Sequence, residues 1–260
     1  MAALQGTTVL VTGAAGGLGK VIASTYLDAG ANVAICDINE ARLSATKEEF
    51  ESTGRFVTFK TDITDEAAVN SLVSEVVSKF GRLDILVNNA GLMDVFDPVG
   101  ELKKETWDKL INVNLTGSFL CMKAAVNTFQ KQEPKGGTII QIGSNASYMG
   151  FCAGTAYTVS KHGVAALVRS TAGFYGDEGI YAIGLMLGGM VDTNIAEGVG
   201  GLGGFNQQGY SKTAASHPFK VEDAVQLKDV AKYCVFLADR SIAATSNGSC
   251  VPFNKNWPKA

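Results

Sequence analysis

The sequence lacks the features that direct a protein to nucleic acid, to a membrane or to a metal ion. Its 22 Lys and Arg residues are outnumbered by 25 Asp and Glu residues, and the net charge of −3 predicts no basic surface for nucleic acid or an anionic membrane. No apolar run approaches the roughly 18 residues that a membrane-spanning helix needs. The five cysteines are scattered and never at C-x-x-C or metal-ligand spacing, which predicts reduced thiols, no metal site and a cytoplasmic protein.

Apolar residues are plentiful and fall into two kinds of segment. They make up 46% of the 260 residues, enough for a sizeable core. Short, nearly continuous apolar runs predict strands at Thr7–Thr12, Asn32–Asp37, Arg55–Lys60, Asp84–Val87, Gly137–Gly143, Tyr181–Leu187 and Ser249–Phe253. Amphipathic stretches predict helices at Gly17–Ala29, Glu40–Ser52, Glu66–Phe80, Thr106–Gln130, Ala156–Tyr175 and Leu227–Leu237. This alternation predicts one α/β domain over residues 1–260, with a doubly wound, mostly parallel sheet of seven strands.

One long segment between the last two predicted strands breaks this regularity. Residues 190–221 are rich in glycine, notably in the run from Gly198 to Gly209. Such a segment is either a disordered surface loop or a mobile lid. Because it follows a strand at the carboxyl edge of the sheet, where ligands bind in open α/β sheets, we favour a flexible substrate lid.

A glycine-rich turn follows the first predicted strand, in T-G-A-A-G-G-L-G from Thr12 to Gly19. Gly13, Gly17 and Gly19 would let the backbone turn sharply and let phosphate groups approach the amides that open the next helix. A tight turn that binds nothing is the alternative, but an acidic residue, Asp37, ends the second predicted strand.

A carboxylate at Asp37 could accept both hydroxyl groups of an adenosine ribose and would repel a 2′-phosphate, which predicts NAD rather than NADP. The alternative is a helix cap, because Asp37 and Asn39 both precede the helix expected at Glu40–Ser52. We favour contact with the ribose.

Tyr157 and Lys161 are four residues apart in Y-T-V-S-K, with Ser144 thirteen residues upstream. On a helix this spacing brings both side chains to one face. An ammonium group there can lower the pKa of the phenol from its ordinary value of about 10 and make it a proton donor and acceptor near neutral pH. The pair therefore predicts a hydride-transfer enzyme once it is joined to a nucleotide turn.

These motifs and three others resemble those of the short-chain dehydrogenase/reductase family, in order and over nearly the whole chain. They are T-G-x-x-x-G-x-G at Thr12–Gly19, N-N-A-G at Asn88–Gly91, N-V-N-L-T-G at Asn112–Gly117, I-G-S at Ile142–Ser144 and Y-x-x-x-K at Tyr157–Lys161. The resemblance implies a single Rossmann-type domain that binds NAD(P), an oxidoreductase acting on a secondary alcohol or ketone, and a homo-oligomer, either a dimer or a tetramer.

The resemblance also implies a role for individual residues. Asn114, Ser144, Tyr157 and Lys161 would form the catalytic tetrad, in which Tyr157 exchanges the proton, Ser144 holds the carbonyl oxygen and Asn114 positions a water beside Lys161. The residues implied to bind the cofactor are Gly13, Gly17, Leu18, Gly19, Asp37, Asp62, Ile63, Asn89, Ala90, Tyr157, Lys161, Val191 and Thr193.

Side chains near these motifs predict a neutral, partly hydrophobic substrate. The candidates are apolar or aromatic and include no Arg or Lys: Leu92, Met93, Phe96, Tyr148, Met149, Phe151, Met190 and Phe205, with limited polarity from Asp94 and Asn145. Two segments depart from the family pattern: Gly188-Gly189, where Pro-Gly is usual and which should loosen the loop, and Asn254-Lys255-Asn256.

Two other functions stay open. The fold could use a bound nucleotide for a non-redox step such as cyclisation, epimerisation or elimination, although the complete tetrad argues against this. A non-catalytic nucleotide-sensing protein would be expected to lose Tyr157 or Lys161.

Overall fold

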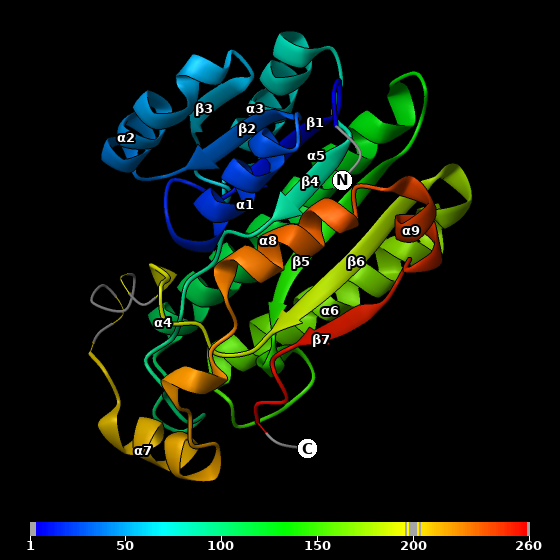
Figure 1. Ribbon diagram of the computed structural model, residues 1–260. Helices are drawn as coiled ribbons and strands as arrows, with labels where there is room; N and C mark the ends of the chain where they lie inside the picture. Colours follow the sequence, from blue (N-terminus) through cyan, green and yellow to red (C-terminus); the bar gives the residue numbers. More distant parts are fainter. Residues whose placement is uncertain (1–3, 196, 198–201, 203, 259–260) are drawn as a thin grey trace.

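A central twisted sheet runs through the structure, with helices packed against it (Figure 1). The computed structural model describes residues 4–195, 197, 202 and 204–258. In this part of the chain the strands are β1 (Thr8–Thr12), β2 (Asn32–Asp37), β3 (Phe56–Lys60), β4 (Ile85–Asn88), β5 (Gly137–Ser144), β6 (Ile180–Leu187) and β7 (Cys250–Phe253). All pair in parallel, in the order β3-β2-β1-β4-β5-β6-β7. The predicted seven-stranded, doubly wound sheet is confirmed.

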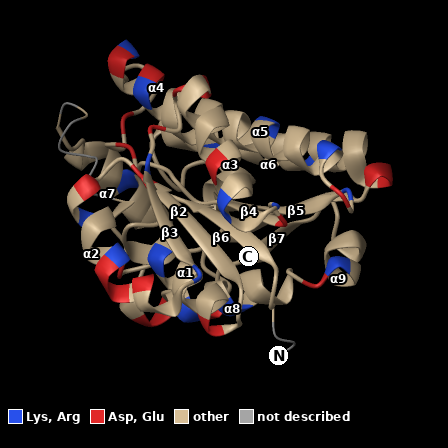
Figure 2. Ribbon diagram, turned by 90° about the horizontal axis from the view of Figure 1, so that it is seen from above, with Lys and Arg blue, Asp and Glu red and all other residues tan. Residues whose placement is uncertain are grey.

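Helices cover both faces of this sheet (Figure 2). They are α1 (Gly17–Asp28), α2 (Glu40–Phe50), α3 (Glu66–Phe80), α4 (Lys104–Ile111), α5 (Ser118–Lys131), α6 (Thr155–Tyr175), α7 (Gln207–Ser216), α8 (Leu227–Phe236) and α9 (Arg240–Thr245). Neighbouring residues of one strand point to opposite faces, so Val9 and Val11 join the core under α1 and α8, and Leu10 joins the core under α3 and α5. None of the described helices has the length and apolar composition to span a bilayer.

The single helix predicted over Thr106–Gln130 is wrong. The chain instead forms α4, a π-helix over Asn112–Gly117 and then α5. Hydrophobic spacing does not distinguish the wider π turn from an ordinary α-helix, and such turns are frequent at functional sites.

The segment expected to form a lid is partly helical. Residues 196, 198–201 and 203 of it lie outside the described residues, but Gln207–Ser216 forms α7, which we did not predict. The side chain of Asn206 caps this helix by accepting a hydrogen bond from the Gly209 amide at 2.8 Å. Helix α7 lies apart from the other helices, beyond the carboxyl ends of the strands (Figure 1).

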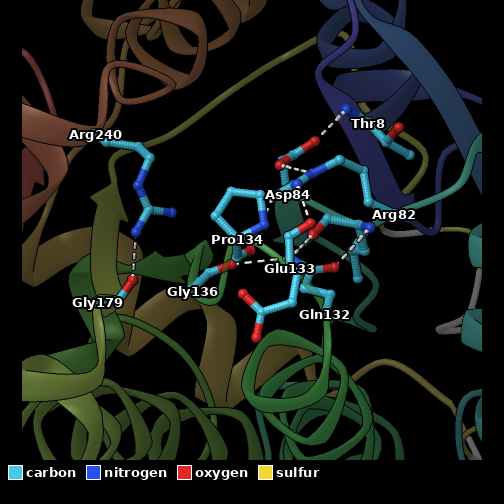
Figure 3. Close-up of polar contacts among 10 residues, drawn as sticks. Thr8, Arg82, Asp84, Gln132, Glu133, Pro134, Gly136, Gly179 and Arg240 are labelled. Carbon is cyan, nitrogen blue, oxygen red and sulfur yellow. Dashed lines mark hydrogen bonds and ion pairs between the residues drawn. The ribbon is translucent and has the colours of Figure 1, made fainter.

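At the amino-terminal ends of the strands, polar contacts connect β1, β4 and the loop before β5 (Figure 3). The Asp84 carboxylate accepts hydrogen bonds from the Thr8 amide at 2.8 Å and from Arg82 Nε at 2.7 Å. The guanidinium of Arg82 also donates to the carbonyl oxygens of Glu133 and Pro134. Asp84 therefore joins β1, β4 and the loop before β5 at a site remote from the strand ends that carry the sequence motifs.

Candidate active site

A cleft of about 720 Å³ opens at the carboxyl ends of the strands. It lies where the chain connections reverse direction, between β1 and β4, which is the usual ligand site of a doubly wound sheet. Residues from the five sequence motifs and from the end of β2 line it together, among them Gly13, Gly17, Leu18, Gly19, Asp37, Asp62, Ile63, Asn89, Ala90, Ser144, Tyr157, Lys161 and Thr193.

The glycine turn is held in place by the loop after β4. Asn89 donates from its side-chain amide to the carbonyl oxygens of Thr12, at 2.9 Å, and Gly13, at 3.0 Å. Gly13 has a φ of +60°, and a Cβ atom on it would lie 2.7 Å from Cα of Ala90. Glycine is therefore required here by both conformation and space.

The residues around this turn fit the diphosphate of a dinucleotide. Helix α1 begins at Gly17, its N-cap Gly16 provides no side-chain cap, and its first turn carries no acidic residue. No side chain among the described residues caps the amides at the start of this helix, and these amides suit an anionic group.

Asp37 stands at the end of β2 and serves the local backbone while it lines the cleft. Oδ2 accepts from the amide of Ala15 at 3.1 Å, and Oδ1 accepts from the amide of Asn39 at 3.0 Å. An ionised carboxylate offers about four acceptor positions, so two remain for other donors. Asn39, not Asp37, is the N-cap of α2, because its side chain accepts from the Arg42 amide.

A contact across the mouth of the cleft was not predicted. The guanidinium of Arg42, on α2, pairs with the carboxylate of Glu197, which also accepts from the side chain of Asn194. The hydrogen bond from Arg42 is the main cause that lowers the pKa of Glu197. Asn194 in turn lies against the glycine turn, where a Cβ atom on Gly16 would be 2.7 Å from its Oδ1. The chain after β6 therefore contacts both α2 and the glycine turn.

Asp62 and Ile63 lie on the far side of this mouth, after β3. Oδ1 of Asp62 accepts hydrogen bonds from the amide and the hydroxyl of Thr64, at 2.9 and 2.7 Å. Ile63 is buried against Gly117, where a Cβ atom would lie 2.7 Å from its Cδ1. Ile63 thus presents an apolar surface to the cleft and Asp62 shapes the turn beside it.

Tyr157 and Lys161 lie on the first turns of α6 and are both nearly fully buried. The Nζ atom of Lys161 donates to the carbonyl oxygen of Ile142 at 3.3 Å and lies 5.5 Å from the centre of the Tyr157 ring. Burial lowers the pKa of Lys161 to about 8.

The expected lowering of the Tyr157 pKa is not what the structure gives. Burial raises the pKa of Tyr157 to about 12, a hydrogen bond with Ser144 acts in the opposite direction, and the charge of Asp94 raises it further. Desolvation by burial is the largest cause of this shift, and the Lys161 ammonium donates to a carbonyl oxygen and not to the phenol.

Ser144 ends β5 and faces the same point of the cleft as Tyr157. Its Oγ accepts a hydrogen bond from the amide of Ala146 at 3.2 Å, and its own amide donates to Ser147 Oγ at 3.0 Å. Since Oγ is already an acceptor, its hydrogen is available to a second oxygen atom.

Asn114 lies within the π-helix, 1% exposed, and does not line the cleft. Its side-chain amide exchanges hydrogen bonds with the backbone of Leu92, at 2.7 and 2.9 Å, and donates to Ser160 Oγ at 3.1 Å. Gly91 separates it from the lysine, because a Cβ atom on Gly91 would lie 3.3 Å from Asn114 Oδ1 and 3.6 Å from Lys161 Nζ. Gly91 is therefore a site residue that we missed, although it belongs to the N-N-A-G motif.

The structure divides the candidate substrate residues. Leu92 and Met190 line the cleft, while Tyr148, Phe151 and Phe205 are exposed outside it. Asp94 does not supply polarity to the cleft as expected, since the residue is 2% exposed and its carboxylate accepts from backbone amides. Among the residues implied to hold the cofactor, Thr193 lines the cleft, and Val191 is 48% exposed and does not.

The glycines at the departure from the family pattern permit close packing of the loop that follows β6. A Cβ atom on Gly188 would lie 2.8 Å from Cα of Asn254, and one on Gly189 would lie 2.3 Å from the Phe219 ring. Asn254 in turn donates to Asn145 Oδ1 at 3.2 Å and to the Tyr148 hydroxyl at 3.1 Å. The unusual segment after β7 thus packs behind Gly188, which lines the cleft, and bonds to residues that follow Ser144.

Comparisons with known proteins agree with this geometry. A family model for short chain dehydrogenases matches residues 7–200. The short chain dehydrogenase/reductase dpchG of Colletotrichum higginsianum is 43% identical over 98% of this chain and 94% of its own length. A 3beta-hydroxysteroid dehydrogenase of Eggerthella lenta is 38% identical over 75% of each chain.

A solved short chain dehydrogenase from Bacillus anthracis superposes with a TM-score of 0.83 at 25% identity, covering 98% of this chain and 97% of its own. The fold, the cleft and these matches establish that the chain belongs to the short-chain dehydrogenase/reductase family. It is therefore an oxidoreductase, and the family implies a nicotinamide dinucleotide as its cofactor.

Proposed function

We propose that the protein is an NAD(H)-dependent dehydrogenase or ketoreductase that interconverts a neutral, partly hydrophobic secondary alcohol and its ketone. The observation that carries the proposal is the meeting of Ser144, Tyr157 and Lys161 in the same cleft as the glycine turn. Loss of the tyrosine or the lysine would have favoured a nucleotide sensor, and both are present.

Two charged groups favour NAD over NADP. The carboxylate of Asp37 lines the cleft at the end of β2, where it would repel a 2′-phosphate. Arg42, the nearest cation after it in the sequence, is paired with Glu197 and so is drawn away from a phosphate at that place. At an effective dielectric constant near 20, two like charges about 4 Å apart repel by about 4 kcal/mol, which supports a preference of roughly two decades or more.

The nicotinamide ring, when bound, supplies or accepts the hydride. Tyr157 is protonated at neutral pH, and it donates its proton to the carbonyl oxygen as the alcohol forms. Ser144 donates a hydrogen bond to the same oxygen and stabilises the negative charge that develops there. Lys161 is close enough to Tyr157 to stabilise the phenolate that remains.

The lining of the cleft near Ser144 supports a neutral substrate. Lys161 and the mouth residues Arg42 and Lys109 are the only cations that line it in the described part of the chain, and Leu92, Ile195 and Met190 add apolar surface. A carboxylate or phosphate on the substrate would lack a dedicated Arg or Lys partner there. The relative from Eggerthella lenta is named for a hydroxysteroid, which is a neutral substrate.

A panel assay tests this function. Neutral alcohols and ketones of increasing size would be offered with NAD(H), and the absorbance of the reduced nicotinamide followed with product analysis. Turnover linked to a change in absorbance is the expected result. Product without net consumption of nucleotide would instead identify the non-redox alternative.

We also propose a homo-oligomer, either a dimer or a tetramer, by family resemblance, and a cytoplasmic location from the scattered thiols. Light scattering coupled to size-exclusion chromatography tests the first, and a monomer at assay concentration would contradict it.

A further inference from the structure

Asp94 is a buried carboxylate that has no cation as its partner among the described residues. It is 2% exposed and makes none of the ion pairs in the described part of the chain. Burial raises the pKa of Asp94, while three backbone hydrogen bonds lower it. The cost of burying this group is therefore offset by main-chain donors, and these donors show what Asp94 does.

Two of the three donors belong to the start of α6. Asp94 Oδ1 accepts from the amide of Gly154 at 3.1 Å, and Oδ2 accepts from the amide of Tyr157 at 3.1 Å. Helix α6 begins at Thr155, and its own N-cap, Gly154, has no side chain to cap it. The third residue of a helix is the usual target of a capping side chain, so Asp94 caps α6 from a loop sixty residues earlier.

Gly154 makes this contact possible. A Cβ atom on Gly154 would lie 2.4 Å from Asp94 Oδ2, too close for the carboxylate to keep its place. The φ of Gly154 is −70°, which an alanine can adopt, so the glycine is required by space and not by backbone conformation.

The loop that carries Asp94 is itself fixed. Asp94 Oδ1 also accepts from the amide of Phe96 at 3.1 Å, and Phe96 has a φ of +65°, a conformation unusual for a bulky residue. Its ring packs against Phe205 and Tyr210, with centroids 5.5 and 5.1 Å away. The loop is thus held from the side of α7 as well as from α6.

We propose that Asp94 is a positioning residue that sets the placement and protonation of Tyr157 through the first turn of α6, without touching substrate or cofactor. The proposal rests on the proposed function of Tyr157 as proton donor and acceptor. The amide of Tyr157 is fixed by the carboxylate, so the ring starts from a fixed backbone. The same negative charge disfavours the phenolate and raises the pKa of Tyr157.

The other charged groups around Tyr157 and Asp94 are few in the described part of the chain. Lys161 lies on the same helix, 5.5 Å from the Tyr157 ring centre. Asp97, in the loop with Asp94, raises the Asp94 pKa by repulsion, and its side chain accepts from Asn206 at 3.0 Å, before α7. Asp97 provides a matched control, because Asp97→Asn removes a charge from the same loop without removing a cap from α6.

The test compares Asp94→Asn with Asp97→Asn. For Asp94→Asn we expect kcat to fall roughly 10- to 100-fold, as for a slightly misplaced reacting group, while KM for the nucleotide stays near normal. The rise of alcohol oxidation with pH, which reports ionisation of Tyr157 to the base form, should move to lower pH because a neighbouring negative charge is gone. Asp97→Asn should leave both unchanged.

Gly154→Ala is the second variant, used alongside the first in case Asp94→Asn does not fold. It keeps the charge but displaces the carboxylate, so kcat should fall in a folded protein that still binds nucleotide. Hydrogen exchange at the amides of Gly154 and Tyr157 should become faster in both variants, and this readout does not depend on turnover.

The outcomes separate the two proposals. The role of Asp94 would be overturned if a folded Gly154→Ala or Asp94→Asn protein kept wild-type kcat, pH profile and amide exchange. It would also be overturned if nucleotide binding and kcat fell equally with no shift in the pH profile. The unmodified protein could instead turn over no alcohol or ketone while amide exchange is still faster in the variants. That result would support the cap and overturn the proposed function.

Discussion

The Nζ atom of Lys161 lies 3.3 Å from the carbonyl oxygen of Ile142 and 5.5 Å from the ring centre of Tyr157. The ammonium therefore donates to a carbonyl near the end of β5 and also lies over the face of the phenol ring. Its burial lowers the Lys161 pKa to about 8, whereas burial raises the Tyr157 pKa to about 12. These two values give the reaction a dependence on pH with a definite sign.

Ketone reduction should fall as the pH rises through about 8. Below that value Lys161 is charged and Tyr157 is protonated, which is the pair that reduction needs. Above it the lysine loses its proton while the tyrosine keeps its own, so the phenolate that forms in the reaction loses its nearest cation. A profile of kcat/KM for reduction against pH measures this. Constant reduction from pH 7 to 10 would show that the charge of Lys161 is not needed.

Asp37→Ala should narrow the preference for NAD(H). The substitution removes the charge that would repel a 2′-phosphate, and it also frees the Ala15 amide that now donates to the carboxylate at 3.1 Å. We expect the ratio of catalytic efficiencies to fall by roughly tenfold or more, as for one charge at a short distance. Both cofactors should be measured under one set of conditions. An unchanged ratio would show that Asp37 only binds backbone amides and does not select the cofactor.

Glu197→Gln should also lower the ratio of NAD(H) to NADP(H) catalytic efficiency, by its effect on Arg42. The Arg42 guanidinium is paired with Glu197, so removal of that charge leaves the cation free for a 2′-phosphate. NADP(H) efficiency should improve several-fold, and further in combination with Asp37→Ala. Arg42→Ala is the control, because in that background Glu197→Gln should have no effect on the ratio.

Asp84→Ala should lower stability without changing catalysis. The carboxylate accepts from the Thr8 amide and from Arg82 at the edge of the sheet remote from the cleft (Figure 3). Loss of hydrogen bonds to a charged group costs about 1.5–3 kcal/mol each, and the partial exposure of this pair favours the lower end. Denaturant unfolding measures the change. A fall in kcat of the folded variant would contradict this separation of fold from function.

Much of the site could be predicted from sequence because its motifs are local. Tyr157 and Lys161 meet because four residues span one helical turn, and the turn at Thr12–Gly19 follows a strand and opens a helix as expected. The contacts that were missed join residues far apart in the chain. Arg42 and Glu197 are separated by 155 positions, and Asp94 reaches Tyr157 across 63, so no local spacing reveals either pair.

Backbone geometry accounts for the other differences. The π-helix around Asn114 has the hydrophobic spacing of an ordinary helix, and its wider turn appears only where Asn114 packs against Leu92. The raised pKa of Tyr157 differs from the expectation because the sequence places a lysine on the same helix face but does not show how deeply the phenol is buried.

The most direct test of the account is the turnover of Tyr157→Phe beside the unmodified protein, with NAD(H) and the best neutral ketone from the panel. The phenyl ring fills the same buried site but has no proton to give, and loss of a general acid typically costs about 100- to 10,000-fold. We predict that kcat falls by that amount while the Kd for NADH, measured by its fluorescence, stays within a few-fold of normal. Wild-type turnover by a folded Tyr157→Phe protein would contradict the proposed chemistry.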